Sequence, residues 1–127
     1  MSADRPRVLV VEDEADLLFT ITLGLELAGY DVLKASSGEE ALAAIGEDTP
    51  DAVLLDLRLP GIDGWEVLRR LGASGRIPGL PVVLLSAQVD AATADRAAEL
   101  GCDAYLAKPF NGTDLDRVLR GVLATRS

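Results

Sequence analysis

The residues of this chain that are best suited to chemistry each stand at the end of a short apolar run. They are three carboxylates, one hydroxyl and one amine, namely Glu12, Asp13, Asp56, Ser86 and Lys108. Clustered carboxylates repel one another, and a divalent cation with oxygen ligands removes that cost. A lysine and a serine can contact the oxygens of a phosphoryl group. Together these residue types suit phosphoryl transfer, which needs in-line positioning and neutralisation of charge.

Asp56 is the expected nucleophile of this set. It ends the central apolar run and enters the loop 57–64, where Pro60 and two glycines favour an unusual backbone path. An aspartyl carboxylate can carry a phosphoryl group covalently, whereas Glu12 and Asp13 are better placed to hold a metal ion or its bound water. Taken singly, each residue type has an ordinary alternative: acidic residues in the first turn of a helix, a serine that caps a helix, and a solvated lysine.

The composition removes several competing classes of site. The sequence has 127 residues, no histidine and one cysteine. This excludes a Ser-His-Asp triad and the zinc sites that need histidine or several cysteines. A metal bound here takes oxygen ligands, as Mg²⁺, Mn²⁺ or Ca²⁺ does. The net charge of −9 argues against a nucleic-acid-binding surface.

Three further features concern the compartment. No apolar run is long enough to span a membrane, and residues 1–7 lack the apolar stretch of a signal peptide. The single Cys102 cannot form an internal disulfide and is expected to be a buried structural thiol. A cytoplasmic protein without membrane contact is therefore expected.

Short β-branched runs alternate with segments of helical periodicity along the chain. The expected strands are 7–11, 31–35, 51–56, 80–86 and 103–107, and the expected helices are 17–28, 37–45, 64–71, 91–100 and 115–123. Gly29 is expected to end the first helix, and Ser37 with Glu40 forms a capping box before the second. Strands separated by helices pair in parallel, so we expect one doubly wound, three-layer α/β domain over 1–127, with its core at about 7–123. Its strands would bring their carboxyl ends, and the polar residues, to one edge.

Four motifs give the sequence a family resemblance. They are Val-Val-Glu-Asp-Glu at 10–14, Asp-Leu-Arg-Leu-Pro-Gly-Ile-Asp-Gly at 56–64, Leu-Leu-Ser-Ala at 84–87 and Gly-Cys-Asp-Ala-Tyr-Leu-Ala-Lys-Pro-Phe at 101–110. In this order and at these spacings, the sequence resembles the receiver domain of bacterial two-component response regulators, of the chemotaxis-regulator type. The resemblance extends from about Arg7 to Leu123 and implies a flavodoxin-like fold with strand order 2-1-3-4-5.

The resemblance also implies roles for the site residues. Asp56 would accept a phosphoryl group from a phosphohistidine on a histidine kinase or a histidine phosphotransfer protein. Glu12 and Asp13 match the acidic pair that positions Mg²⁺, for which Mn²⁺ can substitute, and the backbone carbonyl of Arg58 would be a further ligand. Lys108 matches the phosphate-contacting lysine, and the Lys108–Pro109 bond is cis in the family. Glutamate stands at position 12, where aspartate is frequent in the family.

A second group of roles concerns the response to phosphorylation. Ser86, where threonine is often seen, matches the hydroxyl that moves toward the phosphate, and Tyr105 matches the aromatic residue that then turns inward. Arg58 and Gln88 match positions that tune the lifetime of the phosphoryl group. The surface of the helix at 91–100, the strand at 103–107 and the last helix would change shape for a downstream effector protein or domain. The resemblance leaves open whether phosphorylation also drives homodimerisation.

The helix at 91–100 is expected to be held shallowly by small side chains, namely Ala91, Ala94, Ala97 and Ala98. Such a helix could shift at low cost, and ordinary close packing is the alternative.

The favoured function is therefore a phosphorylatable signalling module that is not an enzyme for external substrates. Two other functions compete with it. One is a protein–protein interaction module that works without phosphate, against which the complete set of site residues argues. The other is a Mg²⁺-dependent phosphatase of the haloacid-dehalogenase type, whose nucleophile lies in an Asp-x-Asp motif after the first strand. Here that strand is followed by Glu12-Asp13.

Overall fold

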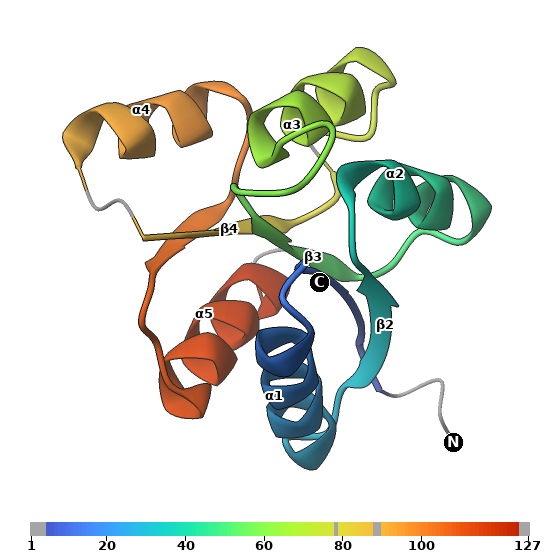
Figure 1. Ribbon diagram of the computed structural model, residues 1–127, viewed down its shortest axis with the longest axis vertical. Helices are drawn as coiled ribbons and strands as arrows, with labels where there is room; N and C mark the ends of the chain where they lie inside the picture. Colours follow the sequence, from blue (N-terminus) through green and yellow to red (C-terminus); the bar gives the residue numbers. More distant parts are fainter. Residues whose placement is uncertain (1–4, 78, 88–89, 125–127) are drawn as a thin grey trace.

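The protein is described by a computed structural model that covers residues 5–77, 79–87 and 90–124. In that part of the chain, five parallel strands form one sheet in the order β2-β1-β3-β4-β5. Helices cover both faces, α2, α3 and α4 on one side and α1 and α5 on the other (Figure 1). The strands are β1 (Arg7–Val11), β2 (Asp31–Ala35), β3 (Ala52–Asp56), β4 (Val82–Ser86) and β5 (Ala104–Ala107), and the helices are α1 (Ala15–Leu27), α2 (Gly38–Glu47), α3 (Gly64–Ala73), α4 (Ala91–Glu99) and α5 (Gly112–Ala124). The predicted fold class and strand order are confirmed.

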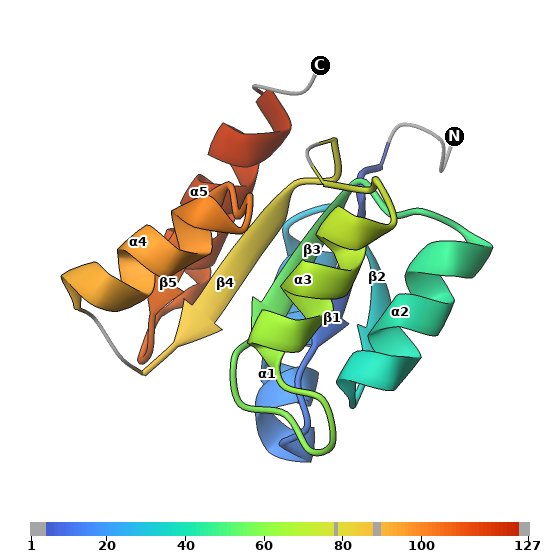
Figure 2. The ribbon, with the colours of Figure 1, turned by 90° about the horizontal axis from the view of Figure 1, so that it is seen from above.

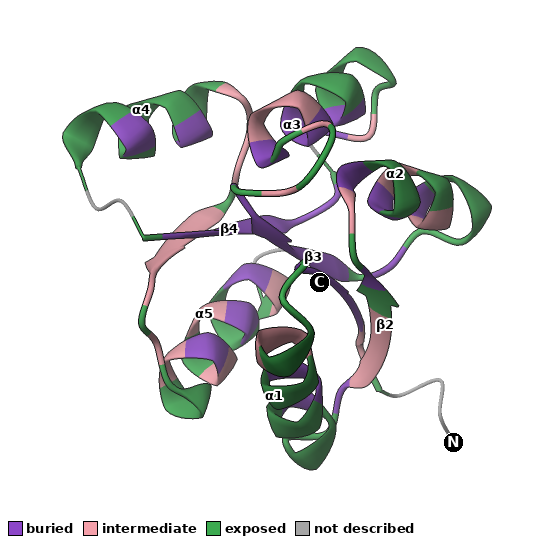
Figure 3. Cartoon of the chain, in the orientation of Figure 1, coloured by how far each residue is buried: buried purple, intermediate pink, exposed green. Residues whose placement is uncertain are grey.

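The three central strands explain why the sheet is stable. Strands β3 and β4 are buried along their whole length, and β1 is buried from its second residue onward (Figure 3). Alternate residues of each strand point to opposite faces, so the sheet supports two apolar cores. Leu55 and Leu84 belong to the core under α2, α3 and α4, whereas Leu54 and Leu85 belong to the core under α1 and α5. The edge strand β5 is only half-buried.

Three strands begin one or two residues later than the sequence suggests. The polar residue before two of them uses its side chain as well as its backbone. Asp51 Oδ2 accepts a hydrogen bond of 2.7 Å from the backbone N–H of Arg7, and Asp103 Oδ2 accepts one of 2.9 Å from that of Val82. Before β4, Pro81 has no N–H to donate. The apolar runs are therefore slightly longer than the hydrogen-bonded strands that they form.

Helix ends follow the predicted cap residues. Gly29, with φ of 102°, follows the end of α1. The Ser37 hydroxyl accepts a hydrogen bond of 3.1 Å from the N–H of Glu40, as the capping box requires. The return bond differs from the standard box, because the Glu40 carboxylate accepts from the N–H and the hydroxyl of Ser36, both at 3.0 Å. The Glu40 side chain therefore anchors Ser36, the residue before the N-cap.

The predicted contact face of α4 is partly wrong. Ala97 is buried, but Ala91, Ala94 and Ala98 are exposed, and Thr93 takes the second buried position. Residues 93 and 97 are four apart and therefore share a helix face, which the run of similar alanines hides in the sequence. The helix is nevertheless held by small side chains, as expected.

Among the described residues, no helix combines the length and the apolar character that a membrane crossing requires.

Candidate functional site

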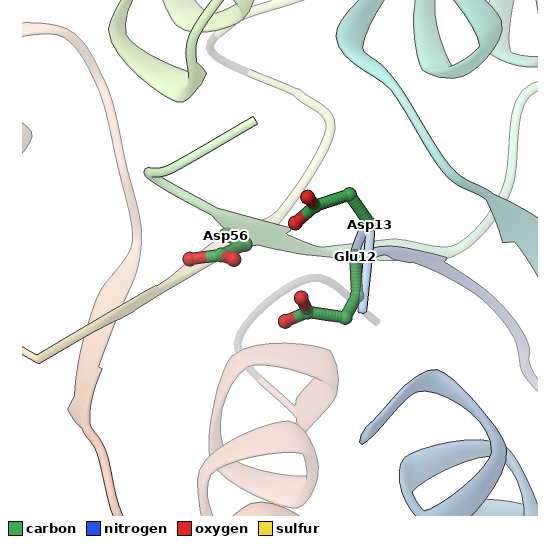
Figure 4. A group of neighbouring side chains, drawn as sticks. All are labelled: Glu12, Asp13 and Asp56. Atoms are coloured by element: carbon green, nitrogen blue, oxygen red, sulfur yellow. The ribbon is translucent and has the colours of Figure 1, made fainter. Parts of the chain in front are cut away.

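The acidic residues meet at the carboxyl edge of the sheet. Strands β1 and β3 are parallel neighbours, with Val11 opposite Leu55, and they end at the same edge (Figure 2). This register places Glu12 and Asp13 beside Asp56 (Figure 4). One carboxylate oxygen from each of the three residues lies within 4.8 Å of the other two. The sequence expectation that these three residues come together is confirmed by this geometry.

The three carboxylates differ in their exposure. Glu12 and Asp56 are 2% and 3% exposed, while Asp13 is exposed at the rim. Because a buried carboxylate loses its hydration, two such groups side by side are costly unless positive charge is near. The site is therefore built to attract a cation.

Lys108 supplies positive charge from the end of β5. Its Nζ lies 3.2 Å from Glu12 Oε1 and 3.2 Å from Asp56 Oδ2. The backbone N–H of Lys108 donates a hydrogen bond of 2.8 Å to the carbonyl oxygen of Ser86 and so fixes the end of β5 against β4. Partial burial acts to lower the pKa of Lys108, but the charges of Asp56 and Glu12 outweigh it and raise that pKa. The ammonium group is thus held in its charged form.

Glu12 is fixed on both sides. Its Oε2 accepts a hydrogen bond of 3.0 Å from the backbone N–H of Glu14, and its own N–H donates to the carbonyl oxygen of Ala35 at 3.0 Å. The pKa of Glu12 is raised, chiefly because burial disfavours the ionised form. The negative charge of Asp56 raises this pKa further, whereas the hydrogen bond from the N–H of Glu14 and the positive charge of Lys108 act to lower it. An extra cation at the site would favour the ionised form.

The loop after β3 passes close to Asp56. The N–H of Arg58 donates to Asp56 Oδ1 at 3.3 Å, and Gly61 has a positive φ of 74°. The N–H of Gly64 donates to the carbonyl oxygen of Leu57 at 2.9 Å. A Cβ atom on Gly64 would lie 2.7 Å from the backbone oxygen of Asp56. Only glycine therefore lets α3 begin this close to the strand that carries Asp56.

The edge of the sheet is hollowed into an open pocket of about 690 Å³. All five residues that the sequence singled out as chemically suited line it, together with Arg58. Ser86 lies in the wall and is 5% exposed. Sequence reasoning missed two further lining residues, Asp63 and Trp65. Asp63 could have been recognised from the sequence as the N-cap of α3, and its side chain accepts a hydrogen bond of 2.9 Å from the N–H of Glu66. Nothing in the sequence marks Trp65 as a residue of the pocket.

Two predicted residues lie outside the acidic cluster. Tyr105 stands on β5 opposite Leu84 and packs against the core under α4. Its Oη is buried and has no hydrogen-bond partner among the described residues. Gln88 lies outside the described residues. The switch and lifetime roles of Tyr105, Ser86, Arg58 and Gln88 stay predictions, and the Lys108–Pro109 bond is cis, as the resemblance implies.

The donor set fits a hard divalent cation. All three cluster residues offer carboxylate oxygens, which Mg²⁺ and Mn²⁺ accept. The exposed position of Asp13 leaves the rim open to water, and Mg²⁺ usually retains several waters. Cys102 is not a ligand for this cation, because its thiol lies at the opposite edge of the sheet. It contacts the carbonyl oxygens of Val82 and Ala104 there, at the start of β4 and β5.

Comparisons with known proteins find similar sequences and folds over most of the chain. The family model described as "Response regulator receiver domain" matches residues 8–120. Among curated proteins, the chain is 40% identical to the transcriptional regulatory protein AfsQ1 of Streptomyces coelicolor over 93% of this chain and 51% of that protein. It is 41% identical to the DNA-binding response regulator MtrA of Mycobacterium bovis over 91% of this chain and 49% of that protein. The chain thus spans about half the length of these curated relatives.

Solved structures give the same result. A putative response regulator from Chloroflexus aurantiacus superposes with a TM-score of 0.89 at 37% identity, covering 95% of this chain and 99% of that one. The receiver domain of the Francisella response regulator 1452 superposes with a TM-score of 0.91 at 28% identity, covering 97% and 100%.

Proposed function

Because the chain belongs to the family of response regulator receiver domains, which act in two-component systems, we propose that it is a phosphoacceptor whose acceptor residue is Asp56. The observation that carries the proposal is the placement of Asp56. It is buried at the carboxyl edge of the sheet, within reach of two further carboxylates and 3.2 Å from an ammonium group. This is an arrangement for handling a charged phosphoryl group in a confined place.

The proposed reaction is a transfer between two proteins. A carboxylate oxygen of Asp56 attacks phosphorus, and the phosphorus–nitrogen bond of a partner's phosphohistidine breaks. The electron pair of that bond stays on the histidine nitrogen, which takes up a proton from water. Lys108 neutralises one phosphoryl oxygen, and the hydroxyl of Ser86 donates a hydrogen bond to another. The protein acts once per phosphoryl group and needs no external substrate, so we do not propose an enzyme.

The proposed metal site consists of Glu12, Asp13, Asp56 and the backbone carbonyl of Arg58. Mg²⁺ bound there would supply positive charge to the transferring phosphoryl group. Before transfer, Lys108 holds Glu12 and Asp56 together, and afterwards it is free to follow the phosphoryl oxygens.

The output is proposed to be a change in the surface formed by α4, β5 and α5, which a downstream effector protein or domain reads. The relatives named as transcriptional regulators and DNA-binding response regulators are about twice as long as this chain, so an effector domain in the same protein is one form that this partner takes. The 1–127 segment is proposed to be the receiver unit, to act in the cytoplasm, and to make no direct contact with nucleic acid.

The test is chemical phosphorylation with acetyl phosphate and Mg²⁺, read by intact-protein mass. We expect one phosphoryl adduct on the parent, none on Asp56→Asn, and an unchanged adduct on Asp95→Asn, a control on the exposed face of α4. An adduct that survives Asp56→Asn contradicts the assignment of the acceptor. A parent that takes no phosphoryl group favours the phosphate-independent interaction module, and turnover of a phosphate ester favours a phosphatase.

Arg58 provides a second test. Its side chain is exposed at the mouth of the pocket while its N–H contacts Asp56 Oδ1. Arg58→Ala removes the side chain and keeps the backbone carbonyl. We therefore expect a change in the rate of dephosphorylation that exceeds any change in the affinity for Mg²⁺. Equal decay rates in the parent and the variant would contradict this role.

A further inference from the structure

Helix α4 is attached to the domain by few side chains. It buries only Thr93 and Ala97, whereas α3 beside it buries Val67, Leu68 and Leu71. Figure 3 shows the outer surface of α4 as almost wholly exposed. Because buried apolar area sets most of the cost of moving a helix, α3 is the fixed element of this pair and α4 the one that moves readily.

One side-chain contact joins these two helices above the sheet. The guanidinium carbon of Arg96, on α4, lies 4.3 Å from the centre of the Trp65 ring, at the start of α3. This distance is within the range of about 6 Å over which a cation is attracted to an aromatic face. Arg96 is exposed and Trp65 is half-buried. The contact bridges an open groove of about 540 Å³ between α3 and α4.

Trp65 also borders the pocket that contains Asp56. A single ring therefore forms part of the wall of both hollows. The N-terminus of α4 is tied to the same pocket from the other direction, because β4 ends at Ser86 and α4 begins at Ala91. A change at Asp56 can thus act on the N-terminus of α4. The Arg96–Trp65 contact, about one turn further along the helix, opposes a displacement of α4.

We propose that the stacking of Arg96 on Trp65 is a latch that positions α4 in the unphosphorylated protein and is released when Asp56 is phosphorylated. This inference rests on the proposed function. Phosphorylation draws Ser86 toward the new charge, and a shift of α4 against the fixed α3 carries the guanidinium off the ring. A contact that is present in only one of two states favours that state. Its removal must therefore favour the phosphorylated form by the same factor.

The size of the effect follows from the contact. An exposed cation–π pair corresponds to about a two- to fivefold change in an equilibrium. Arg96→Ala should raise the hydrogen-exchange rates of α4 amides by this factor in the unphosphorylated protein. It should also raise the apparent affinity for beryllium fluoride with Mg²⁺, a non-covalent mimic of the phosphoryl group, by roughly twofold to fivefold. Arg96→Lys, which keeps a cation, should lie between the parent and Arg96→Ala.

Arg69→Ala is the matched control. Arg69 lines the same groove, but its guanidinium is bound to Glu66 at 2.8 and 2.7 Å. It should leave both measurements unchanged. Trp65 is the only tryptophan in the sequence, so the intrinsic fluorescence reports this ring alone. Saturation of the parent with beryllium fluoride should move its emission toward that of Arg96→Ala, and the same addition to Arg96→Ala should give a smaller change.

The outcomes separate the latch from the proposed function. If the parent forms neither a phosphoryl adduct nor a beryllium fluoride complex, the proposed function and the release step are both overturned, while hydrogen exchange still decides the resting contact. If the parent binds beryllium fluoride and Arg96→Ala binds it equally well, the latch is overturned and the proposed function stands. If Arg69→Ala and Arg96→Ala change hydrogen exchange and beryllium fluoride affinity equally, the latch is also overturned. Such a result would come from the loss of positive charge in the groove and not from the contact with Trp65.

Discussion

The cluster of Glu12, Asp56 and Lys108 allows a quantitative test of why the site attracts a cation. Lys108→Met removes the ammonium group and keeps a side chain of similar length. At an effective dielectric constant of about 20, a pair of unit charges 3.2 Å apart attracts by about 5 kcal/mol. Much of this attraction is offset by the desolvation of the three groups. Breaking a fully buried pair costs about 3–5 kcal/mol, and Lys108 is 24% exposed. We therefore expect Lys108→Met to lower the free energy of unfolding by about 2–4 kcal/mol.

The assay is urea denaturation followed by far-UV circular dichroism, in a chelator and at low salt. Lys34→Met is the matched control, because Lys34 is exposed on β2 and is the only other lysine in the sequence; it should change the free energy by no more than about 0.5 kcal/mol. Saturating Mg²⁺ should reduce the deficit of Lys108→Met, since a bound cation replaces the lost charge and stabilises the folded state.

The double variant decides whether charge is the cause. In Asp56→Asn/Lys108→Met, the repulsion between Glu12 and Asp56 is gone, so the double variant should be more stable than Lys108→Met alone. A double variant as unstable as Lys108→Met would refute the electrostatic reasoning and would show that Lys108 contributes through packing instead.

Three further predictions rest on other parts of the molecule. Gly64→Ala should lower the free energy of unfolding by about 1–3 kcal/mol, because its Cβ would collide with the backbone of β3 and the next residue, whereas Gly72→Ala, in the same helix with open space around it, should be neutral or stabilising in the same urea assay. Burial and the hydrogen bond to Asp116 raise the pKa of Tyr30 to about 12, so its contribution to stability is complete below about pH 10 and is lost as the pH rises through 12, a fall of about 2–3 kcal/mol that Tyr30→Phe should lack. Burial raises the pKa of the Cys102 thiol to about 11, so alkylation near neutral pH should be roughly a hundredfold slower than for a free cysteine, and rapid labelling of the folded protein would contradict that environment.

The sequence predicts the fold well because its local signals are consistent with one another. The runs in β1, β3 and β4 are almost wholly apolar, and the first two helices have a recognisable start or stop, namely Gly29 after α1 and the Ser37 cap of α2. Parallel pairing then follows from the alternation of strands and helices. Boundaries are less certain, since Asp51 and Asp103 take part in hydrogen bonding without being strand residues.

Helix faces were harder to predict where neighbouring residues look alike. In α1, Ile21 and Leu25 are buried, whereas Phe19, Leu23 and Leu27 are 68%, 46% and 81% exposed. Although the helix is apolar nearly all round, the helical spacing of Leu17, Leu18, Ile21 and Leu25 predicts the face that packs on the sheet, and the structure confirms it. In α4 the run of alanines offers no such contrast, so the sequence did not show that Thr93 and Ala97 are the residues that face the sheet.

The sequence by itself determined the chemistry that the site can support. Carboxylates after two strands, a serine, a lysine and the lack of histidine limit the metal and the reaction regardless of how the chain folds. Only the tertiary structure decided the arrangement: that Lys108 lies between Glu12 and Asp56, that these carboxylates are buried while Asp13 is not, and that Trp65 stands between the pocket and α4. The physical reason is that charge interactions and burial depend on distances between residues up to 96 positions apart in sequence, and only the packed sheet and helices set those distances.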